Sequence, residues 1–175
     1  LQTNEIKEIL KEKFPNKSEL DVENSLSYSD GKIGKSIGFL SVEDFENDNF
    51  TDFQNWMRTC YSVNIQEVAK WVNERTKKGR REQSIFLKYS LKMVRNCLIF
   101  HFSDPDNLHV TQKENQFLNK FHLFINEGNI SEITEKIEDC IKNIERNANA
   151  KIMFYELSLQ IIKLLKVKRK FVEIN

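Results

Sequence analysis

Three cysteines and three histidines are the side chains that could serve as nucleophiles or metal ligands. The cysteines lack the paired spacing of a zinc site or redox dithiol. They lie on or beside apolar helical faces, where a thiolate is disfavoured. No histidine shares a helical face with a cysteine or carboxylate at a metal-type spacing. We therefore expect no metal, no catalytic residue, reduced core thiols and a hydrogen-bonded core position for His101. The six residues are Cys60, Cys97, Cys140, His101, His109 and His122.

The segment from Gly31 to Ser36, GKIGKS, resembles the second half of a phosphate-binding loop. A complete loop carries a further glycine and four residues before Gly-Lys-Ser, so that successive backbone N–H groups surround the phosphates. Ser29 stands at that first glycine position, and no strand precedes it. We expect no nucleotide cofactor at this loop.

An acidic segment lies between residues 43 and 52. It lacks the alternation and the glycine of a calcium-binding loop. We expect a solvated linker and an acidic first helical turn there. Its acidic residues are Glu43, Asp44, Glu46, Asp48 and Asp52.

Two basic segments could contact phosphates, or they could complement the negative ends of helices. Neither interleaves aromatic residues in the way of a single-strand nucleic-acid binder. The net charge of the whole chain is only +1, so no global field directs it to nucleic acid or to a membrane surface. The two segments contain Lys77, Lys78, Arg80 and Arg81, and Lys166, Lys168, Arg169 and Lys170.

The elements that position these residues are predicted to be helices. Only five glycines and two prolines interrupt the 175 residues, and apolar side chains recur every three or four positions. The pattern predicts an all-α protein of about nine helices without strands. We expect a three-helix unit over residues 1–45, followed by a helical bundle of about six helices over residues 46–175.

Local signals predict several helix ends. Pro15 should stop the first helix, and Gly79 should separate two others. Thr111 with Glu114 forms a capping-box pattern. Asn129 should cap the helix that follows.

The segment from Glu145 to Leu165 carries apolar side chains on most sides of the expected last helix. Each such side chain gains roughly 1.5–3 kcal/mol on burial. The helix must therefore be covered by its own bundle or by a partner. No apolar run reaches the roughly 20 residues of a membrane span, and the cysteine usage indicates a cytoplasmic protein.

Three segments resemble the C-terminal region of the delta prime subunit of the bacterial DNA polymerase III clamp loader. The first is SDGKIGKSIGFL (29–40), which looks like the last helix of an AAA+ lid domain. The second combines FQNWMR (53–58) with Gly79-Arg80 and FLKY (86–89). The third, NANAK (147–151), precedes an apolar helix that is similar to the closing helix of the family's collar.

The resemblance implies a lid domain over residues 1–45 and, beyond it, the helical collar that holds clamp-loader subunits in a ring. Gly34 stands where ATP-hydrolysing relatives carry a nucleotide-sensing arginine, which fits the non-hydrolysing delta prime subunit. The implied partners are the other clamp-loader subunits, with the sliding clamp and DNA reached only indirectly. No membrane, small-molecule substrate or cofactor is implied, and an AAA+-like module would precede Leu1.

Several polar and aromatic residues are candidates for subunit contacts, because aromatic and arginine side chains commonly anchor protein interfaces. We expect them, with the outward face of the last helix, to lie in or near such contacts. The alternative, which applies above all to the tryptophan, is packing inside a single bundle. The candidates are Trp56, Arg58, Arg95, Asn147, Asn149 and Lys151.

Other interpretations stay open. The chain could be the collar of the delta or the ATPase subunit, and an intact phosphate-binding loop upstream would then replace the delta prime assignment. It could be a free-standing helical regulator that binds nucleic acid through its basic segments, with an affinity that falls steeply with salt. An enzyme is disfavoured, because no catalytic motif is recognisable.

Overall fold

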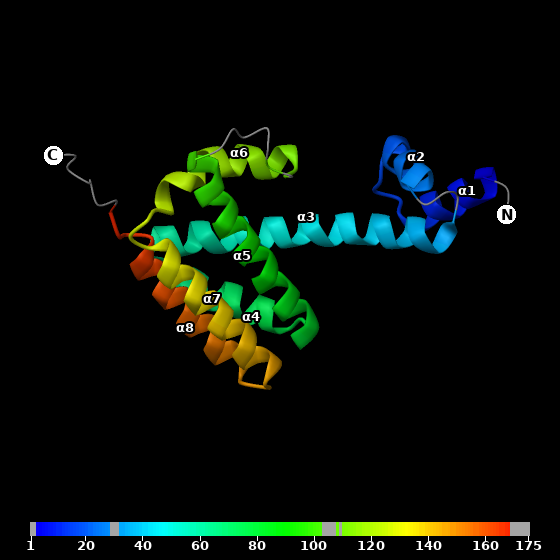
Figure 1. Cartoon of the computed structure of the whole chain (residues 1–175). Helices are drawn as coiled ribbons and strands as arrows, with labels where there is room; N and C mark the ends of the chain where they lie inside the picture. Colours follow the sequence, from blue (N-terminus) through cyan, green and yellow to red (C-terminus); the bar gives the residue numbers. More distant parts are fainter. Residues whose placement is uncertain (1–2, 29–31, 103–107, 109, 169–175) are drawn as a thin grey trace. The chain divides into compact units, whose positions relative to one another are not determined.

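The computed structural model describes residues 3–28, 32–102, 108 and 110–168 (Figure 1). Within these ranges the chain forms eight α-helices and one short 3-10 helix, with no strand, which confirms the all-α prediction. The elements are α1 (Thr3–Lys13), α2 (Glu19–Tyr28), α3 (Ile33–Ser62), α4 (Ile65–Thr76), α5 (Arg80–Phe102), α6 (Gln112–Phe121), η2 (His122–Phe124), α7 (Ile130–Glu145) and α8 (Ala150–Leu164).

The chain divides into two compact units, Leu1–Asp48 and Asn49–Asn175. The division lies inside α3, near the expected boundary at residue 45. The expected linker over residues 43–52 is wrong, because the backbone there is helical. No glycine or proline occurs between Gly38 and Gly79 to interrupt the helix. Two predicted helices are therefore one, and the described helices number eight instead of nine.

The first unit has a small apolar core from its three helical segments, formed by Ile6, Leu10, Val22, Leu26 and Leu40. Across its surface, Lys11 pairs with Glu19 at 2.7 Å, and Lys7 pairs with Glu23. Ser36, from the GKIGKS segment, is buried in α3, and its hydroxyl donates to the carbonyl of Ser25 at 3.3 Å. The Ser36 hydroxyl is therefore hydrogen-bonded inside the first unit.

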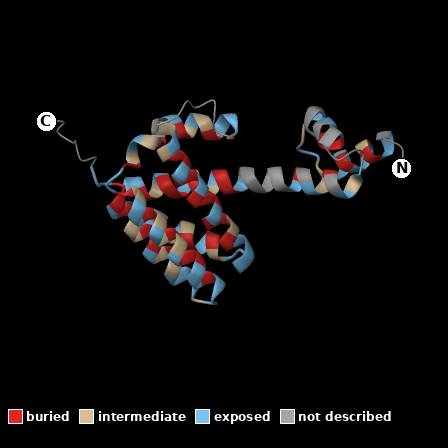
Figure 2. Ribbon diagram, viewed as in Figure 1, coloured by how far each residue is buried: buried red, intermediate tan, exposed pale blue. Residues whose placement is uncertain are grey.

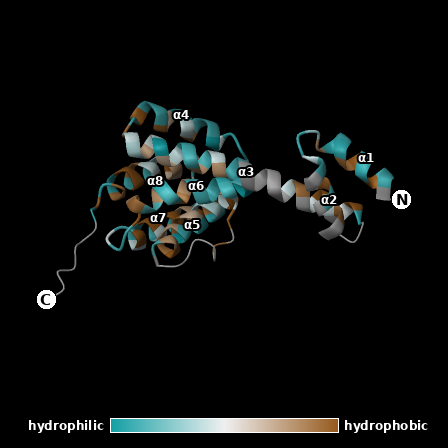
Figure 3. Cartoon of the chain, turned by 90° about the horizontal axis from the view of Figure 1, so that it is seen from above, coloured by the Kyte–Doolittle hydropathy of each residue, from teal (hydrophilic) through white to brown (hydrophobic). Residues whose placement is uncertain are grey.

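The second unit is built around large aromatic side chains that are completely buried, including Phe53, Trp56, Phe86 and Phe154. The indole of Trp56 stacks on Trp71 with ring centroids 5.1 Å apart and an interplanar angle of 5°. Helix α5 packs on α7, and α8 packs on both α7 and α4. Figure 2 shows the buried sides of these helices, and Figure 3 shows hydrophobic and hydrophilic residues alternating along them, as amphipathic helices require.

Helix α8 is the apolar helix of the Glu145 to Leu165 segment, and its own bundle covers a broad face of it. The residues on that face are Phe154, Leu157, Ser158, Ile161, Ile162 and Leu164. The Trp56 indole N–H donates to the Ser158 hydroxyl at 2.9 Å, so the one polar group on this face is satisfied. Among the described residues of α8, Ile152 is the large apolar side chain left exposed, at 58%.

We predict different costs for two truncations within α8. Phe154→Ala should lower the free energy of unfolding of the second unit by about 3–5 kcal/mol, because it leaves a cavity beside Trp71 and Phe86. Ile152→Ala should change it by less than about 0.5 kcal/mol. Both tryptophans belong to the second unit, so urea unfolding followed by tryptophan fluorescence reports that unit. Equal losses would show that the buried face of α8 is wrongly assigned.

Candidate interaction groove

In the second unit, the C-terminal part of α3 and helix α6 form the walls of an open groove of about 430 Å³. On α3 the lining residues recur at three- and four-residue intervals, and α6 shows the same spacing, so each wall is one stripe of a helix. The residues of this α3–α6 groove are Phe50, Gln54, Met57, Arg58, Tyr61, Lys113, Gln116, Phe117, Lys120, Phe121 and Phe124.

The start of α6 is held by a capping box, as the sequence predicts. Thr111 Oγ1 accepts the N–H of Glu114 at 3.2 Å, and Glu114 Oε2 accepts the N–H of Thr111 at 2.8 Å. The second oxygen of this buried carboxylate accepts the Tyr89 hydroxyl at 2.5 Å. Glu114 therefore both caps α6 and ties it to α5, which sets the position of one groove wall.

The floor of the groove consists of aromatic rings in mutual contact. Phe117 stacks on Phe121 with ring centroids 4.9 Å apart, and it meets Phe50 edge-on with centroids 5.8 Å apart. At one end Tyr61 contacts Phe124 at 4.7 Å, while 57% of the Tyr61 surface remains exposed. The groove thus continues the aromatic core outward, from the buried rings of Phe50 and Phe121 to the exposed ring of Tyr61.

The rim of the groove is basic. Arg58, Lys113 and Lys120 line it, together with two glutamines, and no acidic side chain is among the lining residues. Within the described part of the chain these three cations have no ion-pair partner. Elsewhere, bases such as Lys88 and Arg95 pair with acids at 2.8 and 3.0 Å. The groove therefore joins aromatic area with positive charge that the chain itself leaves uncompensated.

The basic segment at residues 77–81 is largely used within the molecule. Lys77 pairs with Glu74 at 2.6 Å, and Lys78 lies 3.4 Å from Asp52. Arg80 donates to the carbonyl of Ala148 at 2.8 Å, beyond the end of α7, where a cation complements the helix dipole. These contacts favour the helix-end interpretation of this segment. In the second basic segment, Arg169 and Lys170 lie outside the described residues.

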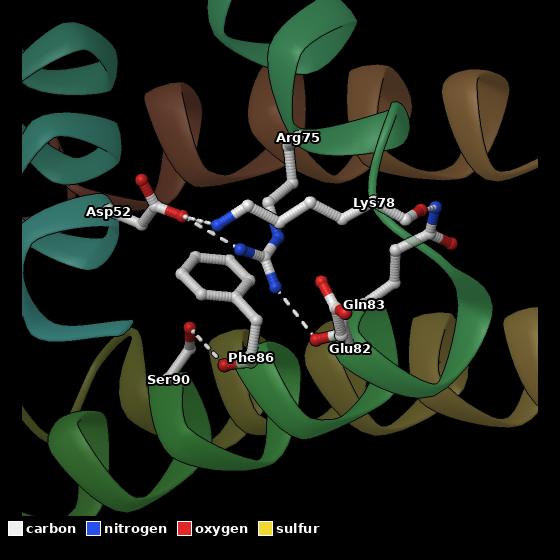
Figure 4. A network of polar contacts seen from close by, with 7 residues as sticks. All are labelled: Asp52, Arg75, Lys78, Glu82, Gln83, Phe86 and Ser90. Carbon is white, nitrogen blue, oxygen red and sulfur yellow. Dashed lines mark hydrogen bonds and ion pairs between the residues drawn. The ribbon is translucent and has the colours of Figure 1, made fainter. Parts of the chain in front are cut away.

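Sequence reasoning missed Arg75, whose charge is buried where α3, α4 and α5 meet (Figure 4). Its guanidinium donates to Asp52 at 2.7 Å and to the carbonyl of Glu82 at 2.7 Å, and it lies 4.1 Å from the centre of the Phe86 ring. Burial lowers the pKa of Arg75, and the Asp52 carboxylate opposes that shift. Arg75 follows Val68 and Val72 at helical spacing on the same buried face of α4, and this spacing could have predicted its burial.

The candidate subunit-contact residues are not brought together on one surface. Trp56 is completely buried in its own bundle, so its side chain is not available to a partner. The alternative of packing inside a single bundle therefore holds for this residue. Arg58 lines the α3–α6 groove. Arg95, on α5, pairs with Glu138 of α7.

The remaining candidates lie at the turn between α7 and α8. Asn147 has a φ of 66°, a conformation that asparagine tolerates better than most residues. Asn149 is the N-cap of α8, and its side chain accepts the N–H of Ile152 at 3.1 Å. Lys151 is exposed. The asparagines of the NANAK segment therefore have a local structural role in starting α8.

The described groups considered for catalysis or metal binding are either buried in the core or hydrogen-bonded to the backbone. His101 Nε2 donates to the carbonyl of His122 at 2.9 Å, which confirms the hydrogen-bonded position expected for it. All three cysteines are buried thiols. No cluster of three or more potential metal ligands occurs among the described residues, and His109 lies outside them.

Comparison with known proteins finds no matching family model, no matching curated protein and no matching solved structure. In the part of the chain that the structure describes, no helix is both long and apolar enough to cross a bilayer.

Breaking the Arg75 junction should destabilise the second unit. Asp52→Asn removes the countercharge of a buried guanidinium, and we expect a loss of about 2 kcal/mol in the free energy of unfolding, below the cost for a fully enclosed pair because Asp52 is partly exposed. Lys78→Ala removes only the exposed partner of the same carboxylate and should cost less than about 0.5 kcal/mol. Urea titrations followed by tryptophan fluorescence compare the two, and equal effects would contradict a buried charge at this junction.

The thiols should be unreactive in the folded chain. Burial raises the pKa of Cys60 and of Cys140 to about 12 and raises the pKa of Cys97 as well. At pH ~8 the thiolate fraction of Cys60 or Cys140 is then lower by about a thousandfold than for an exposed thiol. Alkylation by iodoacetamide, measured by mass spectrometry, should be at least that much slower in buffer than in concentrated guanidinium chloride. Rapid labelling of the folded chain would contradict this assignment.

Proposed function

We propose that this chain is a non-catalytic assembly module, and that it corresponds to the lid and collar region of the delta prime subunit of a bacterial DNA polymerase III clamp loader. The observation that carries the proposal is the α3–α6 groove, in which exposed aromatic area and unpaired positive charge coincide. Aromatic and arginine side chains of this kind anchor many protein interfaces. In this role the chain holds partner subunits, acts in the cytoplasm, and reaches the sliding clamp and DNA only through those partners.

The segments that carry the family resemblance have physical roles that fit such a module. In the second segment, Phe53, Trp56, Phe86 and Leu87 are all core residues of the second unit. In the third, an asparagine with positive φ is followed by the N-cap of α8. A small helical unit also precedes the larger bundle, in the order that a lid and a collar would have. These features support a scaffold whose matching residues maintain its shape.

The position of Gly34 supports the delta prime assignment over an ATPase subunit. Gly34 is exposed near the start of α3, and a Cβ atom placed there would meet nothing within 4 Å. Packing would therefore allow a longer side chain at this position, and the glycine leaves it without the charge that a nucleotide sensor requires. The collar of the delta or the ATPase subunit remains the alternative of the same class.

The nucleic-acid interpretation has weaker support. It relies on the two basic segments, but Lys77, Lys78 and Arg80 already have partners within the chain. An affinity for DNA that falls steeply with salt would revive this interpretation.

The proposal predicts that groove variants impair assembly with purified clamp-loader subunits of the same organism. Arg58→Glu and Tyr61→Ala should each weaken assembly by about tenfold, as loss of an interface anchor does. Lys92→Glu, an exposed charge reversal on α5 outside the groove, is the matched control and should assemble like the wild type. Sedimentation velocity measures the complexes formed. Normal assembly by both groove variants, and by Arg95→Glu and Lys151→Glu, would reject the proposal.

A further inference from the structure

The α3–α6 groove has the geometry of a seat for one further helix. Its α3 wall runs from Phe50 to Tyr61, which at 1.5 Å per residue is about 17 Å, or three helical turns. The α6 wall presents a shorter series from Lys113 to Phe121, about 12 Å, and Phe124 extends it. Side-chain ridges of a third helix fit between two such stripes when the helix axes lie about 8–10 Å apart. Binding an amphipathic helix in a groove of this kind is a common mode of recognition.

The charges around the groove specify what flanks the apolar ridge of that helix. Arg58 lies on the α3 wall, and Lys113 and Lys120 lie on the α6 wall, so positive charge stands on both sides of the aromatic floor. None of the three has an ion-pair partner in the described part of the chain. Acidic side chains on both flanks of the bound helix would complement them, whereas basic flanks would meet like charge on both walls.

Nucleic acid fits the groove less well. Stacking of bases requires free ring faces. Here Phe117 and Phe121 already stack on each other, and Phe50 and Phe121 are each only 7% exposed. Tyr61 is the one largely exposed ring among the lining residues. The floor therefore offers apolar area to a side-chain ridge more than it offers platforms to bases.

Helix α7 of a second copy of this chain is also a poor occupant. Helix α7 is an amphipathic helix with acids on its exposed side, including Glu132, Glu135 and Asp139. Its apolar stripe, however, is already buried in its own bundle through residues such as Ile133 and Ile137. It cannot present that stripe to another molecule without unfolding.

We propose that the α3–α6 groove binds an amphipathic helix of a partner protein, with a ridge of aliphatic or aromatic side chains on the groove floor and acidic residues on both flanks. This proposal rests on the assembly function proposed above and names the chemistry of the partner element. Tyr61 contacts the apolar ridge at one end, and Arg58, Lys113 and Lys120 contact the acidic flanks.

The test uses the full chain and two fluorescent synthetic peptides of about 16 residues, roughly 24 Å long as helices. Both peptides carry leucine and phenylalanine at helical spacing; one has glutamate on both flanks, and the other has lysine. A fluorescent oligothymidine is the third probe. Fluorescence anisotropy should show that the acidic peptide binds at least about tenfold more tightly than the basic peptide.

Variants locate the binding site. The double reversal Arg58→Glu with Lys120→Glu should weaken binding of the acidic peptide by about tenfold or more and reverse the preference between the peptides. Tyr61→Ala should weaken both peptides by about the same factor, because it removes apolar contact. Lys92→Glu should change the affinities by less than about twofold. Circular dichroism and tryptophan emission of each variant verify its fold.

Three outcomes would overturn the inference: equal or absent binding of the two peptides, tighter binding of oligothymidine, or groove-dependent self-association of the chain in sedimentation. The assembly assay separates this failure from failure of the proposed function. If Arg58→Glu and Tyr61→Ala impair assembly although the acidic peptide does not bind, the assembly function stands and only the acidic-helix partner is rejected. If all four variants of the assembly assay assemble normally and the acidic peptide does not bind, both the assembly function and the acidic-helix partner are rejected.

Discussion

The second unit depends on a full positive charge that is placed inside it. The side chain of Arg75 is almost completely enclosed, and α3, α4 and α5 meet around it. Burying a guanidinium is costly unless its charge is paired, and here two of the three guanidinium nitrogens have hydrogen-bond partners while Nε has none. Asp52 supplies the countercharge, the carbonyl of Glu82 accepts a further hydrogen bond, and the Phe86 ring covers the charge. Because other helix arrangements would leave that charge unpaired, the junction favours one arrangement of the three helices.

This constraint also reaches the groove. Asp52 lies on the same stretch of α3 as Phe50 and Gln54, so the contact that positions α3 against α4 also positions one groove wall. The other wall is set by Glu114, which caps α6 and accepts the Tyr89 hydroxyl of α5. Both walls are thus held by carboxylate contacts to neighbouring helices, through the partly exposed Asp52 and the buried Glu114. A site fixed in this way can bind a partner with little loss of side-chain and backbone freedom.

The reactive and charged side chains of the interior differ from those of the groove. The three thiols are buried, the imidazoles of His101 and His122 are hydrogen-bonded, and the buried charges of Arg75 and Glu114 have partners within the molecule. At the groove, three exposed cations without an ion-pair partner among the described residues lie beside aromatic rings, of which Tyr61 is 57% exposed. Such a surface is costly for an isolated chain and useful for one that works within an assembly. That contrast connects the physical properties of the bundle to the proposed role as a holder of partner subunits.

The sequence alone determined the helical class and the start of α6 at its capping box, because these depend on side-chain spacing or on contacts with near neighbours. His101 is hydrogen-bonded as expected, but its side chain is half-buried and its partner His122 is 21 residues away. The sequence did not determine how distant groups pair. The indole of Trp56 meets a hydroxyl 102 residues away, and Asn129, expected only as a cap, donates to the carbonyl of Leu164 at 3.0 Å. The prediction of a linker over residues 43–52 was wrong because acidic residues are compatible both with a solvated loop and with an exposed helix. The burial of Arg75 and the formation of the groove depend on tertiary packing alone. The sequence shows which residues are charged or aromatic, but their solvent exposure and their pairing arise only when separate helices meet.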